Sequence, residues 1–157
     1  YRFNGAEIVP SYFLTITYTG LAYCDAQNFD FSTMVEQLGD MYYIDGSRIK
    51  TGSNFFTPIF PPAMEVLERY NYHLPKLSNQ KMNDYLHLIE SRMNLNKNLT
   101  SHIARHSFAT IVLAHDVPIE NVARMLGHKN IQTTQIYAKI LKSTIARHAS
   151  SLQRIFA

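Results

Sequence analysis

The residues best suited to chemistry in this 157-residue sequence lie in its last third. His102, Arg105 and His106 fall at positions i, i+3 and i+4 of a predicted helix, a spacing that puts their side chains on one helix face. His128 follows the end of a later helix, and Tyr137 stands nine residues after it. These segments could converge on one anionic centre.

Such a set of side chains suits phosphoryl transfer. A phosphodiester under attack gathers negative charge on its nonbridging oxygens, and Arg105 offers paired N–H donors of matching geometry. His102 and His128 can donate hydrogen bonds or relay protons. The hydroxyl of Tyr137, with an ordinary pKa of about 10, becomes a nucleophile only in such a setting. Lys50, on a predicted hairpin, could protonate the leaving oxygen.

Each of these residues also has an ordinary structural explanation. A lone His-x-x-Arg pair is usually a helix surface pair, and Tyr137 is one of ten tyrosines, most of which serve packing. The presence of Gly127 is explained if it ends a helix, and His128 would then complement the negative charge of the helix C-terminus. Lys50 alone is a solvated hairpin lysine. The chemical interpretation therefore depends on the combination and the order of these residues.

Apolar periodicity and capping residues predict a mainly α chain with a small three-stranded antiparallel β-sheet. Helices are predicted at about 6–18, 22–28, 61–71, 78–93, 100–115, 118–127, 131–139 and 142–156. The predicted strands are Met41–Ile44, Arg48–Lys50 and Asn54–Ile59, with Asp45-Gly46 as a hairpin turn and Gly52-Ser53 as a second turn.

Composition limits the class of protein. A hydrophobic content of 46% in 157 residues is typical of one globular domain with its own core. No apolar run approaches the roughly 18 residues of a membrane helix, so no membrane partner is expected. The single Cys24 excludes an internal disulfide and a cysteine-cluster zinc site. These features are typical of a protein of the cytoplasm.

Charge is distributed unevenly along the chain. Residues 1–91 carry six Lys or Arg and ten Asp or Glu, whereas residues 92–157 carry nine Lys or Arg and only two Asp or Glu. Cations placed along a polyanion release its condensed counterions, so a basic half favours a nucleic-acid partner. A solvated basic face is the alternative explanation of the same pattern.

Four motifs resemble those of the tyrosine recombinase (phage integrase) family. The segment His102–Thr110 resembles the family's His-x-x-Arg-His-(Ser/Thr)-Phe-Ala-Thr helix, and Leu126–Tyr137 resembles the Leu-Gly-His segment that leads to the nucleophilic tyrosine. Thr19–Leu21 is similar to the first family motif, and Arg48–Gly52 to the β-hairpin lysine motif. The resemblance covers nearly the whole chain.

The resemblance implies a role for each matching residue. Tyr137 would attack the scissile phosphate and become linked to the 3′ phosphate, while Arg105 holds the nonbridging oxygens. His102 would be the general base or a proton relay, and His128 would stabilise the transition state by hydrogen bonding. Lys50 would protonate the 5′ leaving oxygen. No metal and no cofactor is expected.

The resemblance also implies a fold and partners. Residues 1–157 would form the catalytic domain of a site-specific DNA recombinase or integrase with the tyrosine recombinase fold, and the family's N-terminal DNA-clamping domain would lie outside them. Double-stranded DNA in a bacterial nucleoid is the expected substrate. Residues 142–156 read as an amphipathic helix that would dock on a neighbouring protomer in a homo-tetramer; the alternative is packing on its own domain.

One position departs from the family pattern. Ala22 stands where the family has an arginine directly after Thr-Gly-Leu, although Asp25 matches the supporting acidic residue three positions on. This variant resembles integrases of Bacteroides-type mobile elements, which favours an active site over a dead one. Arg48 is the candidate substitute, because strand alternation would put it on the same face as Lys50. A surface pair with Asp45 is the alternative.

Two rival functions remain open at the level of the sequence. A non-catalytic DNA-binding module is suggested by 118–127 followed by 131–139, which superficially resemble a helix-turn-helix. A metallohydrolase is suggested by His102 and His106, whose i, i+4 spacing suits zinc. That site lacks a third ligand and the glutamate of His-Glu-x-x-His.

Overall fold

A computed structural model describes residues 5–156 of the chain. In that range the elements are α1 Gly5–Thr19, α2 Tyr23–Gln27, α3 Phe31–Met34, β1 Val35–Leu38, β2 Met41–Ser47, β3 Asn54–Pro58, α4 Pro61–Arg69, α5 Asn79–Arg92, α6 Ser101–Ala114, α7 Ile119–Leu126, the 3-10 turns η1 Ile131–Thr133 and η2 Gln135–Tyr137, and α8 Ala138–Phe156. The fold is therefore mainly helical with one three-stranded antiparallel sheet, as the sequence predicts.

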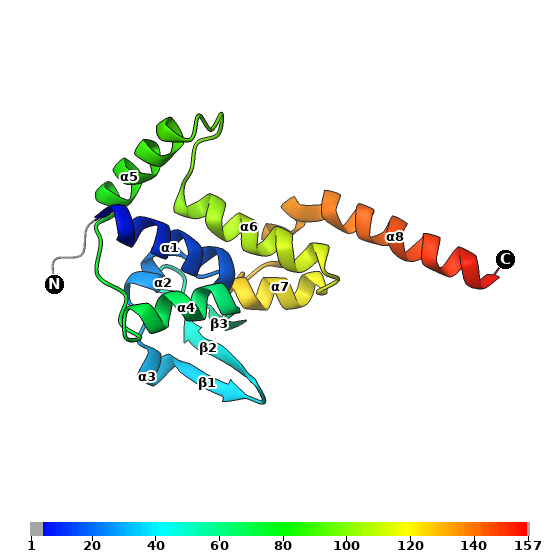
Figure 1. The fold of residues 1–157 in the computed structure, drawn as a ribbon. Coiled ribbons are helices and arrows are strands. Elements are labelled where there is room, and N and C mark those ends of the chain that lie inside the picture. Colours follow the sequence, from blue (N-terminus) through cyan, green and yellow to red (C-terminus); the bar gives the residue numbers. More distant parts are fainter. Residues whose placement is uncertain (1–4, 157) are drawn as a thin grey trace.

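The core has two parts that meet along α6. Helix α1 contacts both α4 and α6 and contributes Tyr12 and Ile16 to the first cluster, beside Ile44 of the sheet. The second cluster lies between α6 and α7 and includes Phe108 and the ring of Tyr137. Figure 1 shows α1, α4 and α6 side by side, with the sheet below them. Tyr137 is thus held by the core as well as by its neighbours in the site.

The sheet has three strands, as predicted, but the residues that form them differ from the prediction. Leu38 pairs with Met41 across a two-residue turn, so β1, which the sequence analysis missed, forms the first hairpin with β2. Gly39 in that turn has φ +61°, a conformation that favours glycine at this position. The predicted hairpin turn at Asp45-Gly46 is wrong, because both residues lie inside β2.

Packing explains the glycine in β2. A Cβ at Gly46 would lie 2.8 Å from side-chain atoms of both Met34 and Phe55, so this position needs glycine for close approach rather than for a turn. The predicted strand at Arg48–Lys50 is also wrong. Residues 48–53 form the loop between β2 and β3, closed by hydrogen bonds between Arg48 and Ser53 and between Gly52 and Arg48.

The helix boundaries follow local capping signals. The Ser78 side chain accepts a hydrogen bond from the backbone of Lys81, and Thr100 does the same for Ile103, so α5 and α6 begin where predicted. Gly127 ends α7 in the left-handed region at φ +64°. The chain turn at Gly127 delivers His128 to the site.

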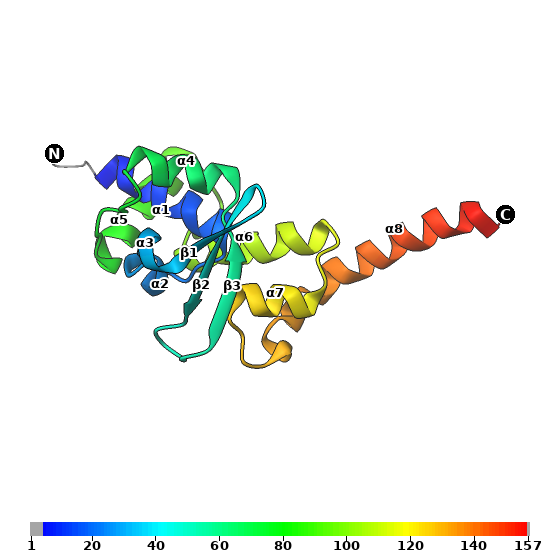
Figure 2. The ribbon, with the colours of Figure 1, turned by 90° about the horizontal axis from the view of Figure 1, so that it is seen from below.

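The segment after α7 differs from the prediction. Residues 131–139 are not one helix: two 3-10 turns occupy 131–137, and a single long helix begins at Ala138. No recognition helix therefore follows α7 there, which removes the helix-turn-helix reading. Helix α8 extends away from the body of the domain in both views (Figures 1 and 2). No helix among residues 5–156 is long and apolar enough to cross a membrane.

Candidate functional site

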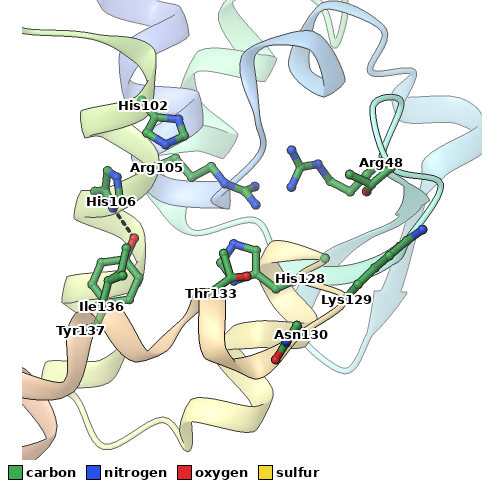
Figure 3. A pocket seen from close by; sticks show the side chains of 12 residues that line it. Arg48, His102, Arg105, His106, His128, Lys129, Asn130, Thr133, Ile136 and Tyr137 are labelled. Atoms are coloured by element: carbon green, nitrogen blue, oxygen red, sulfur yellow. Dashed lines mark hydrogen bonds between the residues drawn. The ribbon is translucent and has the colours of Figure 1, made fainter.

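A pocket of about 390 Å³ opens where α6, the β2–β3 loop, the end of α7 and the two 3-10 turns meet (Figure 3). Its lining is Arg48, Thr51, His102, Arg105, His106, Gly127, His128, Lys129, Asn130, Thr133, Ile136 and Tyr137. The lining contains cations and imidazoles but no carboxylate. Segments far apart in sequence thus form one basic cavity, which suits an anion.

Arg105 forms the floor of the pocket. It lies on α6, is 7% exposed, and donates hydrogen bonds of 2.5 Å to the carbonyl oxygens of Gly20 and Leu126. Burial, and then the neighbouring Arg48, lower the pKa of Arg105 from 12.5 to about 10. The guanidinium therefore stays charged at neutral pH, and two backbone carbonyls fix its plane.

Arg48 brings a second guanidinium to the same place. Its Nη1 lies 3.1 Å from the Leu126 carbonyl oxygen that Arg105 also contacts, and Figure 3 shows the two guanidinium groups facing one another. A Cβ at Gly127 would lie 2.8 Å from Cγ of Arg48, so only glycine there lets the arginine stem pass. Two like charges are thus held together, which is costly unless an anion compensates them.

Asp25 compensates only part of that charge. Its Oδ2 lies 2.7 Å from Nε of Arg48, although neither atom is aligned for a hydrogen bond, while Oδ1 accepts the backbone N–H of Ile49. Asp25 thus fixes both Arg48 and the loop that carries it. The alternative pairing of Arg48 with Asp45 is wrong. Two guanidinium groups against one carboxylate leave a net positive charge in the pocket.

Tyr137 stands at the other side of the pocket. Its hydroxyl is hydrogen-bonded to Nδ1 of His106, and the two ring centroids are 5.5 Å apart. Burial raises the pKa of Tyr137 above its ordinary value of 10, and Arg105 opposes that rise. The ring of His102 stands edge-on to that of His106 at 4.8 Å. A weak nucleophile therefore faces an imidazole, with a guanidinium nearby.

His128 is held with a defined orientation. Its Nδ1 lies 2.7 Å from the hydroxyl of Thr134, which is fully buried. Burial, and then Arg105 and Arg48, lower the pKa of His128 from 6.5 to about 4. The ring is therefore neutral at physiological pH.

Lys50 lies apart from the other predicted residues. It is exposed on the β2–β3 loop and lines a neighbouring cavity of about 370 Å³, which it shares with Ala22, Arg48, His102 and Arg105. Of the seven residues singled out from the sequence, five line the main pocket, Asp25 supports Arg48 from behind, and Lys50 reaches the adjoining cavity. The two cavities share Arg48, His102 and Arg105 in their linings.

Sequence reasoning missed two contacts in the site. His106 was placed on the same helix face as His102 but not assigned to Tyr137, and Thr134 was not identified as the support of His128. Both contacts join segments that are separated by an irregular stretch of chain, so helical periodicity in the sequence cannot predict them. Within residues 5–156, no group of three or more His, Cys, Asp or Glu could hold a metal ion, so the zinc hypothesis finds no third ligand there.

Comparison with known proteins agrees with this geometry. Residues 70–144 match the phage integrase family. The chain is 40% identical over 77 residues to the tyrosine recombinase XerD of Staphylococcus epidermidis, a match that covers 49% of this chain and 26% of XerD. The chain thus spans about a quarter of the length of the curated relatives that it matches.

Solved structures share the fold. XerH site-specific recombinase, in a post-cleavage complex with its palindromic difH substrate, superposes with a TM-score of 0.68 at 18% identity, over 98% of this chain and 48% of XerH. The catalytic domain of bacteriophage HP1 integrase gives a TM-score of 0.61 at 21% identity, over 87% of this chain and 79% of that domain. Residues 70–144 are thus similar in sequence to the phage integrase family, and the chain shares the fold of tyrosine recombinase catalytic domains.

Proposed function

We propose that this chain is the catalytic part of a site-specific DNA recombinase that breaks and rejoins DNA through a covalent 3′-phosphotyrosine intermediate at Tyr137. The observation that carries this proposal is the single pocket that Tyr137, Arg105 and Arg48 line together. A phosphodiester seated on Arg48 and Arg105 would present its phosphorus to the Tyr137 hydroxyl.

Each residue then has a defined task. Arg105 and Arg48 hold the nonbridging oxygens and neutralise the charge that grows on them. Neutral His128, fixed by Thr134 at Nδ1, donates a hydrogen bond from its other ring nitrogen. Lys50, on the exposed loop beside the pocket, protonates the 5′ oxygen as it leaves. These tasks need no metal ion, because the cations of the chain supply the charge.

Double-stranded DNA is the proposed substrate. The basic C-terminal half contributes most of the pocket, and XerH, which shares the fold, is seen bound to its DNA site. The Thr19–Ala22 pattern, followed by Asp25, supports the narrower proposal of an integrase of a Bacteroides-type mobile element that works in the bacterial cytoplasm at the nucleoid.

A nicked suicide substrate tests the proposal. On such DNA the 5′ fragment diffuses away after cleavage, so the covalent intermediate accumulates. The full-length protein should give a protein–DNA adduct that survives denaturing electrophoresis and disappears on protease digestion. Tight binding of the same DNA without any adduct would show a DNA-binding module instead of a recombinase.

The absence of a metal requirement is a separate prediction. Cleavage of the suicide substrate should proceed at an unchanged rate in excess EDTA, because Arg48, Arg105 and Lys50 together supply the charge that a metal would supply. The measurement is the rate of adduct formation with and without chelator. Loss of cleavage in EDTA, reversed by added zinc or magnesium, would support the metallohydrolase hypothesis.

The exposed helix α8 supports a proposed homo-tetramer on DNA. Ile145, Leu152, Ile155 and Phe156 are between 51% and 83% exposed, so these apolar side chains are not packed on their own domain. The N-terminal part of the helix is anchored, because Thr144 is buried and Arg147 pairs with Asp116 at 2.5 Å. We infer that the free end docks on a neighbouring protomer.

Truncation after Lys142 should therefore impair synapsis more than DNA binding. A milder variant, Phe156→Glu, leaves the Thr144 and Arg147 anchors in place and should show the same separation. The measurements are the yield of paired-site complexes and of strand exchange, compared with the affinity for one site. Unchanged strand exchange in both variants would contradict the docking role.

A further inference from the structure

The Tyr137 hydroxyl contacts His106, a residue to which the family resemblance assigns no role. Among the described residues, its hydrogen-bond partner is Nδ1 of His106. Nδ1 of His128 is instead occupied by the Thr134 hydroxyl, and the ring of His102 contacts His106 rather than the tyrosine. Lys50 lies in the adjoining cavity. The family resemblance assigns the proton-transfer roles to His102 and Lys50. The group that contacts the Tyr137 hydroxyl is instead His106.

We propose that His106 is the general base that removes the phenolic proton of Tyr137 during DNA cleavage and returns it during rejoining. This inference rests on the proposed recombinase function and names a catalytic residue within it. His102, edge-on to the His106 ring at 4.8 Å, then acts behind the base rather than on the nucleophile.

The charge state of His106 suits that task. Four titratable or charged groups surround it: His102, Arg105, His128 and Tyr137. Burial, and then His102 and Arg105, lower the pKa of His106 below its ordinary value of 6.5. At neutral pH the ring is therefore uncharged, and in the tautomer that carries its proton on Nε2 the Nδ1 lone pair accepts the hydrogen bond from the Tyr137 O–H.

The step balances as a proton transfer coupled to substitution at phosphorus. The O–H bond of Tyr137 breaks, its proton goes to Nδ1 of His106, and the phenolic oxygen forms a bond to phosphorus. The bond from phosphorus to the 5′ oxygen breaks, and that oxygen takes a proton from Lys50. The new imidazolium lies close to Arg105, a like charge that favours return of the proton when the tyrosine is displaced.

The variant His106→Asn distinguishes a general base from a residue that only holds Tyr137 in place by a hydrogen bond. An asparagine carbonyl can accept the Tyr137 hydrogen bond near the former Nδ1 position, but it cannot take the proton. We expect adduct formation to slow by about 10²-fold or more at pH 7, the usual contribution of general base catalysis, with DNA affinity unchanged. His106→Gln, with its amide one bond further out, provides a second variant if the first folds poorly.

The pH profile gives a readout that a structural role would not move. The wild-type rate should fall at acid pH, below the ordinary pKa of an imidazole, as His106 becomes protonated, and level off towards neutral pH. In His106→Asn that plateau should vanish, and the logarithm of the rate should climb steadily between pH 7 and pH 9, because solvent hydroxide replaces the base.

A substrate with sulfur at the bridging 5′ position completes the test, since a thiolate departs without needing a proton. It should restore cleavage by Lys50→Ala but not by His106→Asn. A wild-type rate and profile in His106→Asn, or its rescue by the sulfur substrate, would overturn the base assignment while the recombinase function stands. An absence of any adduct with the wild-type protein would overturn both.

Discussion

Tyr137→Phe should abolish the covalent protein–DNA adduct while it leaves DNA affinity within roughly twofold of wild type, because it removes a single polar contact. The change deletes the hydroxyl oxygen that we propose attacks the phosphate, and nothing else of the side chain. The ring of Tyr137 is 9% exposed and belongs to the second core cluster, so its packing against α6 and α7 persists in phenylalanine. The measurements are adduct yield on a suicide substrate and affinity by gel mobility shift.

Folding should be little affected by this change. The lost hydrogen bond to His106 is worth about 1 kcal/mol in net stability, a small part of the stability of a domain. Tyr43→Phe is the matched control, since it removes the same atom from a tyrosine on β2 that does not line the pocket, and this variant should cleave normally. An adduct that persists in Tyr137→Phe would assign the nucleophile to another of the ten tyrosines.

The helices were predictable because their signals are local. Ser78, Thr100 and Gly127 each act within one turn of their own position, so the boundaries of α5, α6 and α7 follow from capping chemistry alone. The face shared by His102, Arg105 and His106 follows from the helical period in the same way. The catalytic roles of these residues stay predictions until cleavage is measured.

The sheet was only partly predictable because its decisive contacts are not local. Asp45-Gly46 has the composition of a hairpin turn, yet Gly46 is required where Met34 and Phe55 press on β2. The true turn at Gly39 follows a strand of mostly exposed residues, Val35–Leu38, whose weak apolar pattern gives little signal. A shift of one residue in register moves every side chain of a strand to the opposite face of the sheet. A small error in the predicted position of a strand therefore reverses the face predicted for each of its residues.

The arrangement of the site shows the same division between local and tertiary information. The choice of Arg48 as substitute for the missing arginine placed it correctly in the pocket, but for the wrong reason. Strand alternation does not apply to residues 48–53, which form a loop. Asp25 and the Leu126 carbonyl position Arg48 instead, and both are distant in sequence.

Arg48→Ala is the second change with a large expected effect. We expect DNA cleavage to slow by roughly a hundredfold or more, because loss of one preorganised donor to a developing oxyanion costs about 3 kcal/mol in the transition state. DNA affinity should weaken only mildly, since many other phosphate contacts remain. The measurement is the single-turnover rate of adduct formation at saturating protein.

Stability must be separated from catalysis in this variant. Removing Arg48 leaves the carboxylate of Asp25 buried without its ion-pair partner, which destabilises a fold by a few kcal/mol. Thermal unfolding of Arg48→Ala should therefore be measured beside Arg48→Lys, which keeps a positive charge near Asp25 but loses the planar paired donors. A folded Arg48→Lys that still cleaves slowly would assign the loss to the guanidinium.

The neighbouring cavity allows a direct test of whether Arg48 replaces the arginine that the family has at the position of Ala22. Ala22 and Arg48 line the same cavity of about 370 Å³, so a long side chain at position 22 has room to extend toward Arg105. If Arg48 does the work of the family's first arginine, Ala22→Arg in the Arg48→Ala background should recover part of the lost cleavage rate and also restore a partner to Asp25. Ala22→Met, which fills similar space without charge, should recover nothing. Cleavage at the wild-type rate in Arg48→Ala alone would show that another cation, or another part of the full-length protein, supplies the second clamp on the phosphate.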